Sequence, residues 1–306
     1  MTVVTFPGQG SQKPGFLAPW LEDAESRRTL EHLSETGGID LIRHGTESDA
    51  DTIRDTAVAQ PLIVAAGVLT WDALRARFGD RLDGVAVAGH SVGEIAAAYA
   101  AGVFDAATAI RFVATRARLM AEDAAKTTTG MSAIIGGVEA DIVERLGSLD
   151  LAPANFNGAG QIVAAGEPDA LAELKADPPA GARVIPLKVA GAFHTRWMAD
   201  AQAALAGVEE EFPVSAPVRP IHTNRDGSVV TSGELYRRYL VEQVNRPVHW
   251  DLCMTAFLEA EYAGLVEAAP AGTLAGLAKR GMKGVPAVAV NVPADLDAAG
   301  ELLRGA

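Results

Sequence analysis

The sequence has little of several things on which other protein classes depend. Cys253 is the only cysteine among 306 residues, which excludes an internal disulfide and a multi-cysteine metal site. No apolar run is long enough to span a membrane, and no basic leader with a cleavage site is present, so we expect neither a membrane span nor a signal peptide. The net charge of −13 argues against nucleic acid as a partner. Together these absences predict a cytoplasmic globular protein.

Metal and nucleotide motifs are missing as well. The six histidines are scattered without ligand spacing, so we expect no metal site. Residues 3–6 form an apolar segment that runs into the glycine-rich sequence PGQGSQ at residues 7–12, which lacks the third glycine of a dinucleotide fingerprint and a P-loop lysine. Two interpretations of this turn stay open: an ordinary strand-to-helix turn, or a loop whose bare N–H groups approach an anion closely.

What the sequence does contain is a serine in a sharp turn. An apolar run at residues 84–88 ends in GHSVG at residues 89–93, and an alanine-rich segment follows at once. Strand, tight turn and helix in this order predict a nucleophile elbow with Ser91 at its tip. Gly89 and Gly93 flank it because larger side chains would collide there. The following helix directs its free N–H groups and its positive dipole end toward an oxygen near the hydroxyl.

The order of the remaining segments predicts an α/β protein with an insert. A large α/β-hydrolase-like subdomain with a central parallel sheet is expected from residues 1–126 and 192–306. Residues 127–191 have the order βαββαβ, which is typical of a ferredoxin-like subdomain. Its expected strands and helices cover residues 131–135, 139–146, two strands within 151–165, 168–176 and 182–189.

One arginine has an unusual place on its helix. Asp105 is expected to cap a helix that continues to about residue 125. At the helical period, Arg116 falls inside the apolar arc, whereas Arg111 and Arg118 project from the opposite side. The pattern leaves two interpretations open: a side chain that reaches a surface partner, or an arginine kept in an apolar pocket to bind a carboxylate.

An activated serine needs a base, and histidine suits neutral pH. His194 follows an apolar run, and His222 follows a short strand and is a rival; His249 lies beside Trp250, where core packing explains it. We expect the elbow to turn His90 away from the site. No acid stands out as a third member, but a backbone carbonyl can also hold an imidazole in the correct tautomer.

Five ordered motifs carry a family resemblance. They are FPGQGSQ at residues 6–12, GHSVGE at 89–94, Arg116, GAFH at 191–194 and NRPVHW at 245–250. The chain resembles the malonyl-CoA:acyl-carrier-protein transacylase family of bacterial fatty-acid and polyketide synthesis over nearly its whole length. The ferredoxin-like insert falls where that family has one.

The resemblance implies transfer of a malonyl group from malonyl-CoA, through a malonyl-serine, to the phosphopantetheine thiol of an acidic acyl carrier protein. It implies no cofactor, since malonyl-CoA and coenzyme A are substrate and product. We expect a monomer because no heptads or large apolar surface helix are present. The implied roles are nucleophile for Ser91, base for His194, carboxylate binding for Arg116, oxyanion hole for the N–H groups of Gln9 and Val92, histidine orientation by the Gln243 carbonyl, and substrate contacts for Gln60, Phe193, Asn155 and Asn157.

Other functions remain as alternatives. An α/β-hydrolase-type esterase or thioesterase also carries the serine motif. A methylmalonyl-selective acyltransferase is disfavoured by Phe193, because its ring beside the α-carbon leaves little room for a methyl group. A docking module with a vestigial site is disfavoured by the intact set of motif residues. Candidate docking charges for the carrier protein are Lys188, Arg196, Arg225, Arg246, Lys279 and Arg280.

Overall fold

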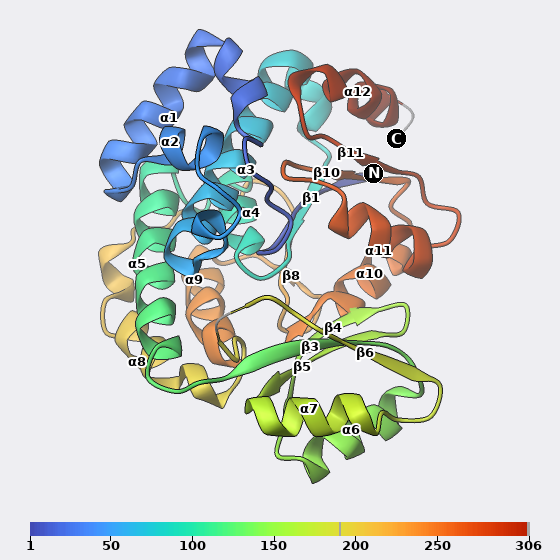
Figure 1. Ribbon diagram of the computed structural model, residues 1–306. Helices are drawn as coiled ribbons and strands as arrows, with labels where there is room; N and C mark the ends of the chain where they lie inside the picture. Colours follow the sequence, from blue (N-terminus) through green and yellow to red (C-terminus); the bar gives the residue numbers. More distant parts are fainter. Residues whose placement is uncertain (190, 305–306) are drawn as a thin grey trace.

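The largest sheet forms the centre of the molecule (Figure 1). The computed structural model describes residues 1–189 and 191–304. Within them, six strands lie in the spatial order β11, β10, β1, β2, β7, β8, and the first five are parallel while β8 is antiparallel to β7. Their bounds are β1 Thr2–Phe6, β2 Ala86–Gly89, β7 Ile221–His222, β8 Val229–Val230, β10 Gly264–Glu267 and β11 Ala287–Ala289.

Alternate residues of the central strands pack on opposite faces of this sheet. Val4 and Val87 contribute to one apolar cluster with α3, α4 and α5, whereas Val3 and Ala88 contribute to a second cluster with α10 and α11. Both faces are therefore covered, which explains why these strands have few polar residues. The bounds of these helices are α3 Thr56–Phe78, α4 Gly93–Ala100, α5 Ala106–Ala124, α10 Trp250–Glu259 and α11 Thr273–Gly281.

Helix α3 is the central helix of the core. The Asp55 side chain caps it by accepting a hydrogen bond from the N–H of Ala57. Among the described residues, this helical stretch is the one whose length and mean hydropathy of 1.5 could cross a membrane. However, 78% of that apolar window is buried inside the molecule, as expected of a core helix. Its apolar composition is accounted for by packing against α5 and α4.

The remaining helices of the large subdomain cover its periphery. The predicted cap of α5 is confirmed, since the Asp105 side chain accepts a hydrogen bond from the N–H of Thr108 at 2.6 Å. The bounds of the peripheral helices are α1 Ala24–Gly37, α2 Leu41–Thr46, α8 Ala199–Ala206, α9 Gly233–Glu242 and α12 Leu296–Arg304.

A second sheet forms the small subdomain, which we define as residues 130–186. Its strands lie in the order β6, β3, β5, β4, and helices α6 and α7 cover the face turned away from the large sheet (Figure 1). This is the strand order of a ferredoxin-like unit, and the predicted fold class is confirmed. The bounds are β3 Gly130–Gly136, α6 Glu139–Ser148, β4 Ala152–Gly158, β5 Gln161–Gly166, α7 Pro168–Ala176 and β6 Ala182–Pro186.

Two details of the small subdomain differ from the expectation. Strand β6 ends at Pro186 instead of residue 189. A fifth strand, β9 (Val248–His249), comes from the large subdomain and pairs in parallel with β4. The predicted boundaries at residues 127 and 191 stay a prediction. Residues 190 and 305–306, which the predicted ranges include, lie outside the described part of the chain.

Candidate active site

Ser91 stands at the tip of a tight turn between β2 and α4. Its φ of 54° lies in the left-handed region, which side chains other than glycine rarely adopt. A Cβ on Gly89 would lie 2.0 Å from the carbonyl carbon of Gly93, and a Cβ on Gly93 would lie 2.1 Å from the carbonyl oxygen of Phe6. Both glycines are therefore required, as predicted, for the turn to pack this closely.

Asn224, which no motif in the sequence indicated, holds the elbow in place through hydrogen bonds. The Oδ1 atom of Asn224 accepts a hydrogen bond from the N–H of Ser91 at 2.7 Å, and its Nδ2 donates to the Gly89 carbonyl at 2.7 Å. Its own N–H donates to the Glu94 carboxylate at 2.7 Å. Asn224 follows β7 at the carboxyl end of a parallel strand, where functional residues of such sheets gather. This position is the feature of the sequence from which a role for Asn224 could have been predicted.

The histidine paired with the serine is His194. Its Nε2 lies 2.6 Å from the Ser91 Oγ, and its Nδ1 lies 2.8 Å from the main-chain carbonyl oxygen of Gln243. Since a carbonyl only accepts, Nδ1 carries the proton and Nε2 is free to accept the serine proton. Burial, together with the charge of Arg116, lowers the pKa of His194 to about 3. The imidazole is therefore neutral and ready to act as a base.

The other candidate histidines have different surroundings. His222 is buried in the core, where its Nε2 lies 2.9 Å from the Tyr262 hydroxyl. Its Nδ1 donates to the Gly227 carbonyl at 2.8 Å, since a carbonyl only accepts. His249 stacks on Phe156 with ring centroids 4.7 Å apart. Both rings are thus explained by packing rather than by contact with the serine.

The expectation that the elbow turns His90 away is wrong. Its ring lines the same cavity as Ser91, and its Nε2 lies 2.8 Å from the Oδ1 atom of Asn157 in the small subdomain. Because Gly8 has no side chain, it leaves the space that this ring needs, since a Cβ there would lie 2.9 Å from His90 Nδ1. His90 therefore bridges the two subdomains beside the nucleophile.

Arg116 is buried, with 1% of its surface exposed. Its two terminal nitrogens donate to the side-chain oxygens of Gln60 at 2.5 Å and Gln243 at 2.8 Å. Burial lowers the pKa of Arg116 to about 10, and the nearby Glu94 charge acts against that change. The guanidinium therefore stays charged at neutral pH. Because the side chain is buried, the interpretation that Arg116 reaches a surface partner is wrong.

The loop after β1 lies against the elbow. The N–H of His90 donates to the Phe6 carbonyl at 2.9 Å, and both Gln9 and Val92 line the cavity that holds Ser91. Within residues 1–189 and 191–304, the main-chain N–H groups of Gln9 and Val92 donate no hydrogen bond. Two free donors beside a nucleophile can stabilise an oxyanion that forms there.

The cavity around Ser91 lies between the two subdomains. Phe193 is buried in its wall, and Asn155 contributes a buried Oδ1 atom that has no hydrogen-bond partner in the described part of the chain. Asn157 contacts His90 but does not line the cavity itself. The lining residues are Gln9, Gln60, His90, Ser91, Val92, Met120, Met131, Asn155, Val163, Leu187, Val189, Phe193 and His194.

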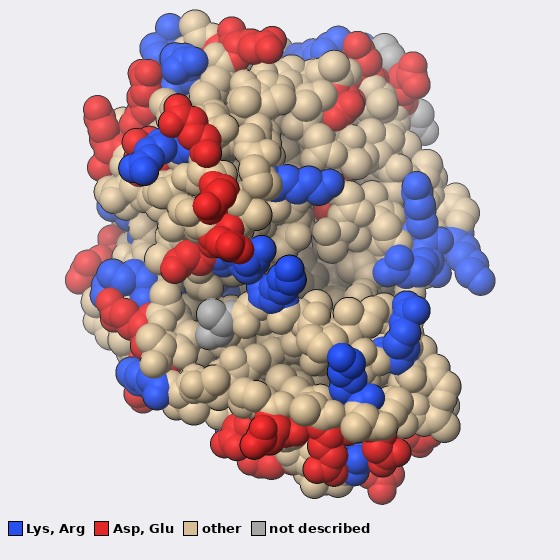
Figure 2. All heavy atoms as spheres, viewed as in Figure 1, with Lys and Arg blue, Asp and Glu red and all other residues tan. Residues whose placement is uncertain are grey.

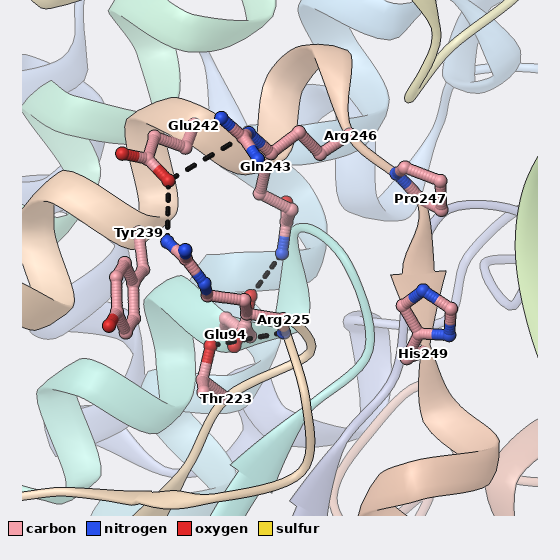
Figure 3. A pocket seen from close by; sticks show the side chains of 9 residues that line it. All are labelled: Glu94, Thr223, Arg225, Tyr239, Glu242, Gln243, Arg246, Pro247 and His249. Atoms are coloured by element: carbon pink, nitrogen blue, oxygen red, sulfur yellow. Dashed lines mark hydrogen bonds and ion pairs between the residues drawn. The ribbon is translucent and has the colours of Figure 1, made fainter.

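Basic side chains lie around the hollow between the subdomains, and acidic ones lie beside them on the large subdomain and over the outer surface of the small subdomain (Figure 2). Gln243, Arg225 and Arg246 are among the residues that line a second cavity (Figure 3). Both arginines pair with Glu242, at 2.8 Å and 3.8 Å. Arg196, another candidate docking charge, pairs with Asp150 at 2.5 Å and stacks on its neighbouring tryptophan.

Comparison with known proteins agrees with this geometry. The family described as acyl transferase domain matches residues 3–298. The malonyl CoA-acyl carrier protein transacylase of Mycobacterium tuberculosis (strain ATCC 25618 / H37Rv) is 48% identical over 297 residues, covering 97% of this chain and 98% of that protein. The crystal structure of MCAT from Mycobacterium tuberculosis, also 48% identical, covers 99% of both chains with a TM-score of 0.94.

A second solved structure contains a carrier protein. It is the complex of PlMCAT with holo AntF, described as a type II PKS acyl-carrier protein with its malonyl-transacylase. It is 33% identical to this chain, covers 98% of this chain and 99% of its own, and has a TM-score of 0.91. The chain therefore belongs to the acyl transferase domain family, among the malonyl CoA-acyl carrier protein transacylases.

Proposed function

We propose that this protein transfers the malonyl group of malonyl-CoA to the phosphopantetheine thiol of an acyl carrier protein. The observation that carries the proposal is the Ser91–His194 pair, 2.6 Å apart, in a cavity lined by Gln60, whose side chain accepts from the buried guanidinium of Arg116. A nucleophile with its base and a buried cation fits an acyl group that ends in a carboxylate.

The first half-reaction loads the serine. His194 Nε2 takes the hydroxyl proton as the Ser91 Oγ attacks the thioester carbonyl, and the main-chain N–H groups of Gln9 and Val92 hold the resulting oxyanion. The carbon–sulfur bond then breaks, and His194 returns its proton to the sulfur, so that coenzyme A leaves as a thiol. The Gln243 carbonyl accepts from Nδ1–H throughout and stabilises the imidazolium that forms transiently.

The second half-reaction runs in reverse with a different thiol. The phosphopantetheine thiol gives its proton to His194, its sulfur attacks the malonyl-serine ester, and the proton passes to the departing Ser91 Oγ. The unpaired Oδ1 atom of Asn155 supports this route, because it can accept a hydrogen bond from an amide of the pantetheine arm. No cofactor takes part in either proposed step.

Selectivity for the malonyl group follows from Arg116 and Phe193. A carboxylate makes charge-assisted hydrogen bonds with the Arg116 guanidinium, whereas a neutral acetyl group makes none. Phe193 opposes a methyl branch on the α-carbon, which favours malonyl over methylmalonyl. Gln60 fixes one side of the guanidinium through its Oε1 atom.

An acyl carrier protein is the second partner that this proposal needs. The complex of PlMCAT with AntF is a structural relative that contains one. Because the whole chain carries a charge of −13, an acidic carrier must meet a local positive patch, and the basic rim of the hollow supplies one (Figure 2). We further propose that the protein acts as a cytoplasmic monomer.

The test is intact-mass analysis after mixing with malonyl-, methylmalonyl- and acetyl-CoA in turn. We expect a malonyl adduct on the wild type, little adduct from the other two thioesters, and none on Ser91→Ala. Adding holo carrier protein should discharge the adduct onto the carrier. Retention of the adduct by Ser91→Ala, or rapid hydrolysis of an ester dye without carrier protein, would contradict the proposal and favour an esterase.

A further inference from the structure

A buried carboxylate lies behind the catalytic pair and has no role in the steps above. Glu94 is 1% exposed and follows Ser91 by three residues in α4. The groups that face it are donors: the N–H of Asn224 at 2.7 Å, the Tyr236 hydroxyl at 3.4 Å, and the Nε2 of Gln243. Burial raises the pKa of Glu94 to about 8, and the hydrogen bonds from Asn224, Thr223 and Gln243 act against that change because they favour the ionised carboxylate.

Gln243 connects this carboxylate to the reacting groups. Its Nε2 donates to Glu94, as Figure 3 shows, while its Oε1 accepts from Arg116 at 2.8 Å. Its main-chain carbonyl accepts from the Nδ1 of His194 at 2.8 Å. One residue therefore serves the base through its backbone and the carboxylate-binding arginine through its side chain.

The orientation of the Gln243 amide follows from three neighbours: Arg116, Glu94 and the Ser91 carbonyl, which accepts from the same Nε2 at 3.3 Å. Its oxygen must face the guanidinium of Arg116, because that group only donates, and its nitrogen must face Glu94, because a carboxylate only accepts. The opposite orientation would place two donors against each other on one side and two acceptors on the other. Glu94, together with the Ser91 carbonyl, thus determines which atom of the amide is presented to Arg116.

We propose that Glu94 is a positioning residue, which acts through the Gln243 amide to hold Arg116 in the geometry that binds the acyl carboxylate. The inference rests on the proposed function, since it assumes that Arg116 binds the malonyl group. Glu94 touches no reacting atom. Its effect is therefore expected on the preference for malonyl over acetyl, more than on the reactivity of the serine.

The substitution Glu94→Gln tests this with almost no change of shape. Its oxygen still accepts from the N–H of Asn224, which leaves its NH₂ group facing Gln243. The Gln243 amide then either turns over, so that its own NH₂ group faces the Arg116 guanidinium, or shifts away from the new NH₂ group while it still donates to the Ser91 carbonyl. Both outcomes disturb its hydrogen bond to Arg116. We expect acylation by malonyl-CoA to fall about 10- to 100-fold, as for a lost hydrogen bond to a charged group, while acetylation changes little.

Single-turnover acylation, followed by rapid quench and intact mass, gives both rates on the full-length protein. Glu267→Gln is the matched control, because Glu267 is equally buried and accepts from the N–H groups of Gly272, Leu274 and Ala275 away from this network. We expect it to lower the melting temperature without changing the malonyl-to-acetyl ratio. The proposal is overturned if Glu94→Gln lowers both rates equally, or leaves the ratio unchanged.

A second variant keeps the test decisive if Glu94→Gln does not fold. Gln243→Met removes the amide but keeps the main-chain carbonyl that holds His194, so it should lower the malonyl-to-acetyl ratio in the same way. In the double variant, Glu94→Gln should add no further loss of preference, because the route from Glu94 is already broken. A wild-type ratio in Gln243→Met, or additive losses in the double variant, overturns the proposal.

The same data separate this proposal from the proposed function. If the wild type forms no malonyl adduct on Ser91, the proposed function itself fails. If the wild type is malonylated and the Glu94 and Gln243 variants keep its preference, only the positioning role fails.

Discussion

Removal of the buried guanidinium is the sharpest perturbation of acyl selectivity. Two of the five N–H donors of Arg116 are used by Gln60 and Gln243, which leaves three for a substrate carboxylate. A bidentate contact makes two charge-assisted hydrogen bonds at ~1.5 kcal/mol each, or ~3 kcal/mol together. At ~1.4 kcal/mol per factor of ten, Arg116→Ala should slow malonylation of Ser91 roughly 100-fold.

Acetylation responds differently to the same change. The acetyl group has no carboxylate to lose, and the substitution removes an unpaired buried charge that opposes a neutral acyl group. The acetyl rate should therefore stay within about threefold of the wild type or rise, so that the preference for malonyl collapses. Rapid-quench mass spectrometry with malonyl-CoA and acetyl-CoA, at equal concentration and in separate reactions, measures both rates.

The same helix offers a matched control for Arg116→Ala. Arg118 lies two residues further along α5, is exposed, and pairs with Glu122 at 2.9 Å. Because an exposed pair of this kind contributes only about 0.5 kcal/mol, Arg118→Ala should leave both acylation rates and the melting temperature near wild type. A malonylation rate in Arg116→Ala within threefold of the wild type, or an equal fall for acetyl, would refute the assignment of the carboxylate-binding residue.

Two further predictions follow from the elbow and its base. Because the pKa of His194 is lowered to about 3, the rate of acetylation, which does not depend on Glu94, should stay level from pH 8 to about pH 5, and a midpoint near 6.5 would contradict the neutral buried base. For the same reason the unfolded chain binds this proton more readily than the folded one, so the free energy of unfolding should fall as the pH drops below 6.5 toward 3. Gly93→Ala should lower the free energy of unfolding by about 3 kcal/mol, because the new Cβ would overlap the Phe6 carbonyl oxygen. Gly84→Ala is the control and should unfold near the wild-type temperature, since no atom lies within 4 Å of its new Cβ. Equal melting temperatures for the two variants would show that the elbow tolerates a side chain.

Local features of the site could be predicted from the sequence. The spacing of Gly89, Ser91 and Gly93 after an apolar run encodes the elbow, since the collisions that require the glycines arise among neighbours in the chain or with one adjacent strand. Helical periodicity alone allows Arg116 either to reach the surface or to lie buried in an apolar pocket. The family resemblance favours the buried position.

Contacts between distant segments could not be predicted in the same way. Asn224 lies 133 residues from Ser91 in the sequence, and its three hydrogen bonds to Gly89, Ser91 and Glu94 depend on the packing of β7 beside β2. The choice among three histidines likewise depends on which of them reaches Ser91 in space. The resemblance implied that the Gln243 carbonyl orients His194. It did not imply the role of the Gln243 side chain, whose hydrogen bonds to Glu94 and Arg116 join residues that form no pattern in the sequence.

The pairing of β9 with β4 has a mechanical consequence. This two-residue strand belongs to the large subdomain in the chain and to the small sheet in space, with Asn155 opposite Val248 and Phe156 opposite His249. Because Asn155 also lines the cavity of Ser91, this pairing joins a wall of the cavity to both subdomains. A hinge motion that separated the subdomains would have to break the backbone pairing of β9 with β4, so we expect the acyl thioester to reach Ser91 without such an opening.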